Sequence, residues 1–465
     1  MWSFHPKMLF LLNLIGLISG LRAASTFSHF PFLTLWNAPT EICSSQYGVD
    51  LDLGMFNIIQ NQNQTFMGEN ITILYADKLG LYPRYSDKGV AMNGGVPQNS
   101  SLDKHLRVAR ENITTFIPKR DFQGLGVVDW ESWRPVWERN WDKKQVYWEG
   151  SKALVKSKHP DWSPAQVQAA ARAEFQQSGR KFMEETLKLG QEMRPNGLWG
   201  FYGFPNCYNY YSNKSRNYTG ECPAVELKRN DELSWLWNVS SALYPDIYLS
   251  LELRGLGREV LLYVHHRILE AMRASAQVTP QELPIFPYAR IVYTYSLEFL
   301  TQASARSILQ NGLAQVFYSE MSFAPQEHLV YTIGESAAVG SAGVVLWGDN
   351  TFSKSKASCE AVKSYIDETL GPYLVNVTSA AVLCSQTMCS SQGRCHRKDP
   401  ESRSYLHLDP AEWKVASEEK PGGRRNYRVS ALSDGLKVQL TKSAFQCRCY
   451  PGWGGKDCSK PTERR

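Results

Sequence analysis

The chain has 465 residues, a formal net charge of +6 and 43% hydrophobic residues. This length is sufficient for one large domain and one small domain. The positive charge is too low and too dispersed to indicate a nucleic-acid-binding protein, although it would help to attract an acidic polymer.

The N-terminal residues have the pattern of a secretory signal peptide. Lys7 precedes an apolar run over residues 8–18, and small residues follow at 23–25. The run is too short to span a membrane, so we expect residues 1–24 to be removed. No other run of eighteen apolar residues occurs, and the chain ends in polar and charged residues. We therefore expect no membrane anchor, and a protein that is secreted or lysosomal via the secretory pathway.

Eight Asn-x-Ser/Thr sequences support a glycoprotein. Such sequences also arise by chance, and one beside a buried strand would not be used. The doubtful site precedes the apolar run 71–75, which has the composition of a strand. The eight candidate sites are Asn63, Asn70, Asn99, Asn112, Asn213, Asn217, Asn238 and Asn376.

Short apolar runs alternate with helical patterns along most of the chain. The runs end near residues 36, 74, 128, 201, 247, 288 and 346, and each is followed by or ends in an aromatic or polar residue. The clearest helical pattern covers Pro164–Met193, and others cover residues 102–116, 262–276 and 359–370. Strands that alternate with helices predict a parallel sheet, and about seven such units predict an α/β fold of the (β/α) barrel type.

One of these apolar runs ends in two carboxylates, Asp129 and Glu131. Side chains two apart on a strand share a face, with Cα atoms roughly 6.5 Å apart. Two close carboxylates repel, so one retains its proton to higher pH, as a general acid must. The alternative is a strand end whose acids form salt bridges with Arg134 and Lys119.

In a barrel of this kind, functional residues lie at the carboxyl ends of the strands and face one cleft. An aromatic residue at any single strand end is more simply explained by core packing. Their recurrence at the same position of each unit favours a cleft. The residues expected to meet there are Tyr75, Asp129, Glu131, Tyr202, Tyr248 and Trp347.

The composition changes near residues 377–381, where cysteines become frequent. We expect the barrel to cover residues 25–378 and a small C-terminal domain to cover 379–465. A Cys-x-Cys pair followed by Gly-Trp-Gly resembles a disulfide-rich module of the EGF-like type. A zinc site is the less favoured alternative in a secreted chain. The long stretch 399–445 inside the module predicts an internal loop. The pairing usual for such a module is Cys384–Cys395, Cys389–Cys447 and Cys449–Cys458.

Four cysteines lie outside the module, and four cysteines allow three pairings. Cys207–Cys222 would close a loop that carries two glycosylation sites. Cys43–Cys359 would tie the first strand region to the last helix of the barrel.

No cofactor is expected, and no residues have the spacing of a metal site. His265 and His266 are adjacent on a predicted helix, where neighbouring side chains diverge. We therefore interpret them as surface histidines.

Five motifs follow one another in order: Pro39–Cys43, Gly94–Gln98, Val128–Pro135, Leu198–Asn209 and Gly334–Ala338. Together they strongly resemble the animal hyaluronidases, glycoside hydrolase family 56. The resemblance runs from about residue 30 to residue 458. Within the family it favours the soluble branch that occurs in lysosomes and plasma.

The resemblance implies a distorted, TIM-like (β/α) barrel that cleaves the β-1,4 bond between N-acetylglucosamine and glucuronate in hyaluronan. It implies retention of configuration, with the acetamido oxygen of the sugar as nucleophile. Carried onto this chain, it makes Glu131 the proton donor and then the base that activates water. Asp129 would hold the acetamido N–H, and Tyr202 would donate to or orient the acetamido oxygen.

The same resemblance implies four substrate-binding residues. Tyr248 would contact the same sugar, and Trp347 would form an apolar wall against its acetyl methyl group. Tyr75 would contact sugar, and Arg290 would pair with glucuronate. Arg134 is expected to hold structure near the acids.

Two other functions remain open from the sequence. One is a catalytically inactive hyaluronan-binding relative, which the presence of both Asp129 and Glu131 disfavours. The other is an enzyme acting mainly on chondroitin, whose charge is similar. Relative to the family, residues 300–324 add about two dozen residues near the cleft. We expect a monomer with hyaluronan, or alternatively chondroitin, as substrate.

Overall fold

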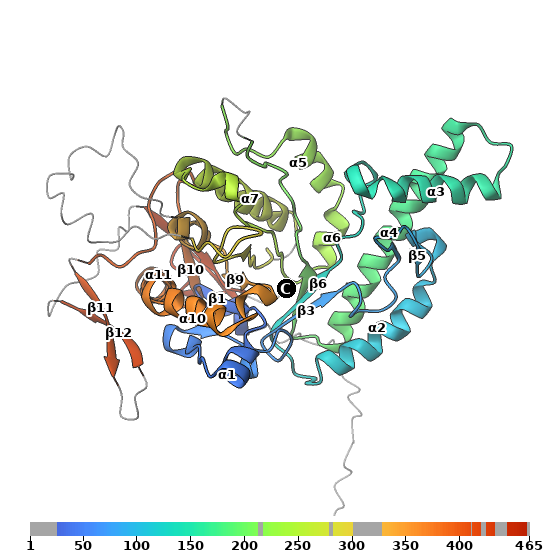
Figure 1. Cartoon of the computed structure of the whole chain (residues 1–465). Helices are drawn as coiled ribbons and strands as arrows, with labels where there is room; N and C mark the ends of the chain where they lie inside the picture. Colours follow the sequence, from blue (N-terminus) through green and yellow to red (C-terminus); the bar gives the residue numbers. More distant parts are fainter. Residues whose placement is uncertain are drawn as a thin grey trace, which may run out of the picture.

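A computed structural model describes residues 26–212, 217–278, 282–300, 328–410, 412–419, 425–432 and 444–462. The predicted signal peptide, Asn213 and nearly all of the added segment 300–324 lie outside these residues. In Figure 1 strands β1, β3, β6 and β9 occupy the centre, with α7, α10 and α11 on one side and α2 and α4 on the other.

Parallel strands form two sheets. One has the order β3, β6, β7 and the other the order β2, β1, β9, β8. Segment 243–246 links them, because Tyr244 bridges in parallel to Tyr202 and Asp246 bridges in parallel to Tyr288. The strands are β1 (Leu33–Asn37), β2 (Ile58–Ile59), β3 (Ile71–Tyr75), β6 (Leu125–Asp129), β7 (Leu198–Phe201), β8 (Tyr288–Ala289) and β9 (Gly343–Trp347). The sequence-predicted TIM-like barrel is confirmed. Its strands are buried, as expected for the continuous apolar runs of a parallel sheet that helices cover.

The seam between β2 and β3 is joined by a side chain. Asn61 is 1% exposed. Its Oδ1 accepts from the backbone N–H groups of Asn70 and Ile71, both at 3.0 Å. Its Nδ2 donates to the carbonyls of Thr65 and Ile71, both at 2.8 Å. One amide therefore satisfies backbone groups at this edge, where an unpaired buried group would be costly.

The helices cover the outside of the strands. They are α1 (Glu41–Tyr47), α2 (Leu102–Phe116), α3 (Gln145–Lys158), α4 (Pro164–Met193), α5 (Ala224–Asp231), α6 (Ser234–Val239), α7 (Gly257–Ala276), α9 (Glu335–Val339), α10 (Lys356–Tyr365) and α11 (Gly371–Met388). The start of α4 follows from its sequence, because Ser163 and Gln166 form a reciprocal capping box and Pro164 occupies the first turn. Across the described residues, none of the helices is both long and apolar enough for a membrane span.

The C-terminal part is joined closely to the barrel. The predicted boundary at residue 378 lies inside helix α11, and one continuous apolar cluster includes Val344, Ala380 and Cys395. The stretch predicted as an internal loop contains a hairpin, which the sequence analysis missed. The remaining strands are β4 (Arg84–Tyr85), β5 (Ala91–Met92), β10 (Gly393–Arg397), β11 (Trp413–Glu419), β12 (Arg425–Ala431), β13 (Phe445–Cys449), β14 (Trp453–Gly454) and β15 (Lys460–Pro461).

All ten cysteines form disulfides, and the pairs are those expected from the sequence. Cys43–Cys359 connects α1 to α10, across 316 residues of chain. The other four are Cys207–Cys222, Cys384–Cys395, Cys389–Cys447 and Cys449–Cys458.

The interpretation of His265 as a surface residue was wrong. Its side chain is buried, with Nδ1 at 2.8 Å from Glu335 Oε1 and Nε2 at 3.1 Å from Glu401 Oε1. Arg397 of β10 binds the same Glu335 through two nitrogens, at 2.7 and 2.8 Å. The histidine therefore belongs to a buried ionic cluster where α7 and α9 meet the C-terminal strands. Its helix pattern could not reveal partners so distant in sequence.

We expect Asn61→Ala to destabilise the fold, because it removes four hydrogen bonds at the β2–β3 seam. Leaving buried backbone groups unsatisfied should lower the free energy of unfolding by on the order of 3 kcal/mol. Urea unfolding of the oxidised protein measures this, with the exposed Gln62→Ala as the matched control. Equal stability of the two variants would show that the seam does not depend on Asn61.

Candidate active site

The two carboxylates lie at the carboxyl end of β6 in contrasting surroundings. Asp129 is the last residue of the strand and is 8% exposed, whereas the Glu131 side chain, just beyond the strand, is 56% exposed. Between them Trp130 is buried and stacks on Tyr82, with ring centroids 4.6 Å apart. The β6 end thus carries one buried carboxyl and one that reaches solvent.

Burial sets the protonation of Asp129. Removal from water, and then the negative charge of Glu131, raise its pKa to about 8, while Arg134 acts in the opposite direction. Its Oδ1 atom is buried and has no hydrogen-bond partner among the described residues. The sequence analysis expected the retained proton on Glu131, and the structure assigns the raised pKa to Asp129. The pair therefore holds a proton from acidic to neutral pH.

Two cations lie beside Glu131. Arg134 Nη2 is 3.4 Å from its Oε2, and Arg134 Nη1 donates to its backbone carbonyl at 3.2 Å. Lys144 Nζ donates to the same carbonyl and, at 3.4 Å, to that of Ser132. Arg134 thus makes the salt bridge that the simpler interpretation predicted. Lys119, the second cation named in that interpretation, is exposed on the loop after α2.

The four predicted aromatic residues form a continuous wall from β3 to β9. Tyr75 is the register partner of Asp129, and its hydroxyl accepts a 3.1 Å hydrogen bond from Trp347 Nε1. Trp347 stacks on Tyr248 with centroids 5.9 Å apart, and Tyr248 lies 6.1 Å from Tyr202. The structure therefore brings together the strand-end residues that were expected to share a cleft.

Burial keeps the tyrosine hydroxyls of this wall protonated. It raises the pKa of Tyr202, Tyr248 and Tyr75 far above neutral pH, and neighbouring acids add to the effect. Each hydroxyl can therefore donate a hydrogen bond at any pH at which the protein is folded. Within the described residues, no three His, Cys, Asp or Glu side chains are grouped as a metal ion would require.

Arg290 lies behind this wall. Its Nη2 is 2.9 Å from Asp349 Oδ2, and its guanidinium lies 4.8 Å from the centre of the Trp347 ring. It is largely buried. The carboxylate that it binds in this structure is therefore Asp349, and its guanidinium makes a cation–π contact with Trp347.

Sequence reasoning missed three polar residues near the strand ends. Asp246 follows the strand segment after β7 and is paired with Arg267 at 2.7 Å. Asn37, the last residue of β1, donates to the carbonyl of Phe66 at 3.0 Å. Both lie at strand ends, where the pattern could have revealed them. Lys144 lies outside any strand and gave no such signal.

The predicted glycosylation sites differ in accessibility. The exposed ones are Asn63, Asn99, Asn217 and Asn238. Three others are half-buried, with side-chain amides in hydrogen bonds to the backbone: Asn70, Asn112 and Asn376. Because a glycan must extend into solvent, the exposed group fits the modification better.

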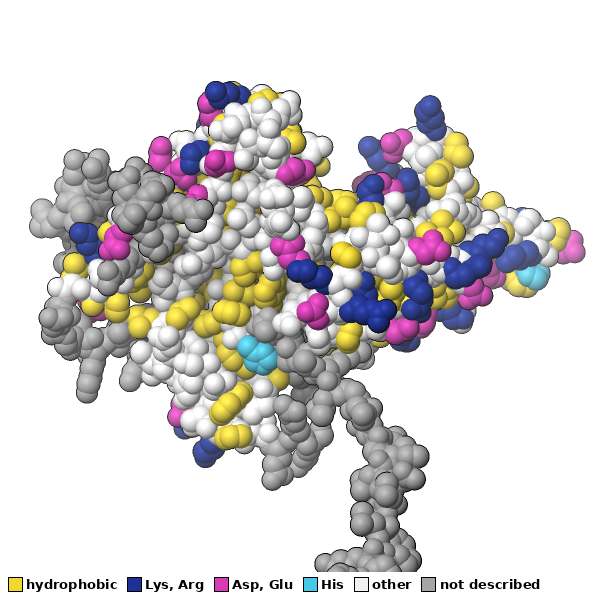
Figure 2. All heavy atoms as spheres, turned by 90° about the horizontal axis from the view of Figure 1, so that it is seen from below, with side chains coloured by type: hydrophobic (Ala, Val, Ile, Leu, Met, Phe, Trp, Pro, Cys, Tyr) yellow, Lys and Arg dark blue, Asp and Glu magenta, His cyan; other side chains and the backbone are white. Residues whose placement is uncertain are grey.

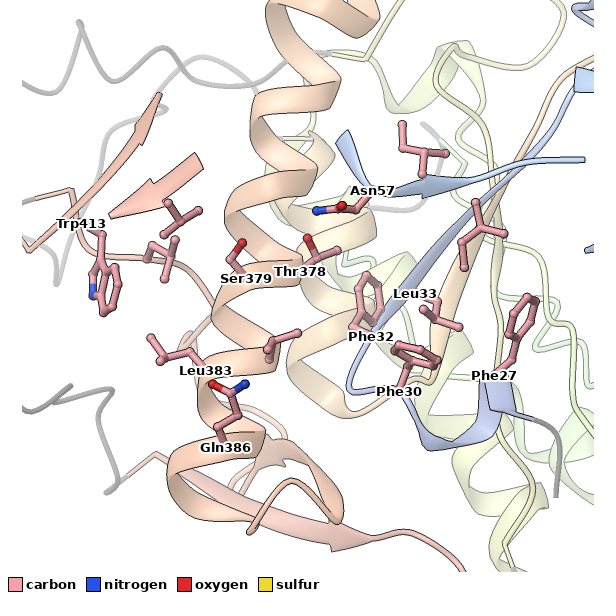
Figure 3. Close-up of a pocket in the computed structure, with 15 residues that line it drawn as sticks. Phe27, Phe30, Phe32, Leu33, Asn57, Thr378, Ser379, Leu383, Gln386 and Trp413 are labelled. Carbon is pink, nitrogen blue, oxygen red and sulfur yellow. The ribbon is translucent and has the colours of Figure 1, made fainter. Parts of the chain in front are cut away.

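A large apolar cavity, of about 620 Å³, lies away from the carboxylates. Leu33 and Ile58, the first residues of β1 and β2, form part of its wall, so it adjoins the amino ends of the strands. Helix α11 contributes Ser379 and Leu383, and the β11–β12 hairpin contributes Trp413 (Figure 3). The acidic residues are at the opposite ends of the strands, so this cavity is not the catalytic site.

We expect the carboxyl of Asp129 to make stability depend on pH. Its pKa is about 8 in the folded protein against an ordinary 3.8, so between these values the folded state binds more protons. Stability therefore falls as the pH rises from about 4 to about 8. The melting temperature of Asp129→Asn, relative to wild type, should increase across this range. The exposed Asp121→Asn should show no such trend, and a constant difference for Asp129→Asn would contradict the assignment.

Comparisons with known proteins identify the family of this chain. The family model described as hyaluronidase, glycosyl hydrolase family 56, matches residues 21–310 and 313–462, with its break inside the added segment 300–324. The chain is 43% identical to hyaluronidase-1 of Sus scrofa over 459 residues, covering 99% of each. It is also 43% identical to hyaluronidase-1 of Homo sapiens over 455 residues, covering 98% of each.

Solved structures of a hyaluronidase also resemble this chain. The crystal structure of bee venom hyaluronidase in complex with a hyaluronic acid tetramer matches with a TM-score of 0.63 and 32% identity. The match covers 73% of this chain and 98% of the bee protein. A second, monoclinic crystal structure of the bee protein matches with a TM-score of 0.61. With its paired carboxylates at the end of β6 and this near full-length similarity, the chain belongs to the hyaluronidase family.

Proposed function

We propose that this protein hydrolyses the β-1,4 bonds of hyaluronan with retention of configuration, with the substrate's own acetamido group as nucleophile. The observation that carries the proposal is the contrast at the end of β6. A buried carboxyl, Asp129, retains a proton beside an exposed carboxyl, Glu131, that can reach a bound polymer. The bee venom relative was solved with a hyaluronic acid tetramer, and this supports the choice of polymer.

Glu131 is proposed as the proton donor. It would protonate the leaving glycosidic oxygen as the acetamido oxygen attacks the anomeric carbon, and it would then take a proton from the incoming water. Asp129 would hold the acetamido N–H. Asp129 is 8% exposed at the end of β6, and from there it would accept that hydrogen bond. While the shared proton resides on Glu131, the Asp129 carboxylate would also stabilise the positive charge that develops on the acetamido group.

The aromatic wall would position the acetamido group. The Tyr202 hydroxyl, kept protonated by burial, would donate to the acetamido oxygen. Tyr248 and Trp347 are stacked on one another and would present an apolar surface to the sugar and its methyl group. Tyr75 would contact sugar beside them. Because Arg290 is paired with Asp349, we propose that it stabilises Trp347 and acts on glucuronate only indirectly.

The charge distribution suits an anionic polymer. Figure 2 shows Lys and Arg side chains, with some acidic ones between them, over the part of the molecule formed by α2, α3 and α4. The whole chain has a formal net charge of +6, and this surface would raise the local concentration of a polyanion. We propose that the protein acts as a secreted or lysosomal glycoprotein monomer, with chondroitin as the alternative substrate.

Replacing Glu131 with Gln should abolish turnover while the polymer still binds. The loss should be 10²–10⁴-fold or more, because the amide cannot donate the proton that the leaving oxygen requires. Hyaluronan depolymerisation, with chondroitin assayed in parallel, measures this, and Glu149→Gln on the exposed face of α3 is the control. Unchanged turnover by Glu131→Gln would refute the assignment. A folded but inactive wild type that binds hyaluronan would favour a binding role.

We expect kcat/KM to decrease as the pH rises toward 8. The Asp129 carboxyl loses its proton near its pKa of about 8, and no proton then remains at the paired carboxyls for the leaving oxygen. A pH–rate profile on hyaluronan oligosaccharides at constant ionic strength measures this. A maximum well above neutral pH would contradict the scheme.

A further inference from the structure

The residue proposed as proton donor is not part of a strand or helix. Strand β6 ends at Asp129, and the next regular element is a 3₁₀ turn at Trp137–Arg139. Glu131 therefore has no strand ladder to fix its backbone. Yet a proton donor must be placed within about an ångström, because a shift of that size costs about 10²-fold in rate.

Lys144, which lies in a different element, binds the backbone at Glu131. It ends the 3₁₀ turn Asp142–Lys144 and directly precedes α3, which packs along α4. Its Nζ donates to the carbonyls of both Glu131 and Ser132. Two charge-assisted hydrogen bonds from one ammonium to adjacent carbonyls restrict the peptide plane between them.

This contact has an electrostatic cost. Lys144 is half-buried, and burial lowers its pKa to about 8, with the nearby charge of Arg134 adding to the effect and Glu131 opposing it. Its neighbour Lys143 is exposed. A lysine would normally extend its charged end into water. The ammonium instead lies against the segment that carries the carboxyl.

We propose that Lys144 is a positioning residue, which fixes the peptide unit at Glu131–Ser132 and thereby the carboxyl of Glu131. The inference rests on the proposed role of Glu131 as proton donor. Arg134 contacts the same carbonyl but also the carboxylate itself, so changing it would alter the charge at the acid. Lys144 binds this segment through its backbone carbonyls, and Lys144→Arg can test those contacts while keeping the positive charge near the acid.

The test compares Lys144→Met, Lys144→Arg and Lys143→Met in the full, oxidised chain. The kcat and KM for hyaluronan oligosaccharides are measured at one acidic pH, together with the melting temperature. We expect Lys144→Met to lower kcat by about 10²-fold with little change in KM or melting temperature. Lys144→Arg, which keeps charged donors, should recover most of the rate. Lys143→Met should match wild type.

Three results would overturn the inference: wild-type kcat in Lys144→Met, a rise in KM without a fall in kcat, or no recovery in a folded Lys144→Arg. If Lys144→Met does not fold, Lys144→Gln replaces it and should show the same loss of kcat. Failure of both to fold would assign Lys144 to the fold alone and refute a positioning role. Glu131→Gln measured alongside separates the two proposals. If it is inactive while Lys144→Met is normal, only this inference fails; if it is active, the proposed function fails.

Discussion

Burial of the Asp129 carboxyl is the constraint on which the rest of the site depends. A carboxyl removed from water is unstable as an anion unless partners compensate for the lost solvation. Here the charged neighbour with the largest effect is another acid, Glu131, and the opposing charge of Arg134 does not reverse the shift in the Asp129 pKa. The barrel therefore favours the neutral form of a carboxyl at the end of a central strand up to a pH of about 8.

The barrel can maintain this arrangement because its apolar strands end together. In-register pairing of β3 and β6 sets Tyr75 beside Asp129. Trp347 of β9 donates a hydrogen bond to the Tyr75 hydroxyl and stacks on Tyr248. Arg290, which contacts Trp347, forms a salt bridge with Asp349. Rigid packing of large aromatic rings excludes water, and this exclusion keeps the Asp129 carboxyl neutral.

Much of this could be predicted from the sequence, because local patterns carry the information. The apolar runs gave the strands, and the helices at 102–116 and 164–193 have the bounds that their periodicity predicted. The strand ends gave Asp129, Tyr75 and Trp347. What local patterns could not give are partners set by the tertiary fold, such as Asn61 at the seam, the acids around His265, and Asp349 beside Arg290. The hairpin within 399–445 was missed because a long insertion in a small module resembles a loop.

Asp129 lies in a strand, whereas Glu131 lies on irregular backbone, and this structural difference fits the separate roles proposed for the two carboxyls. Asp129 belongs to a strand, so its position is set by the hydrogen bonds of the barrel, as its proposed role as acceptor for the acetamido group requires. In the proposed scheme Glu131 serves two successive steps, first at the leaving oxygen and then at a water molecule, and both require its side chain to reach solvent. An exposed side chain on irregular backbone has that freedom, but its backbone then needs anchoring from outside the strand. Cationic side chains that bind the carbonyl, rather than the carboxylate alone, anchor the backbone while leaving the acid able to change partners.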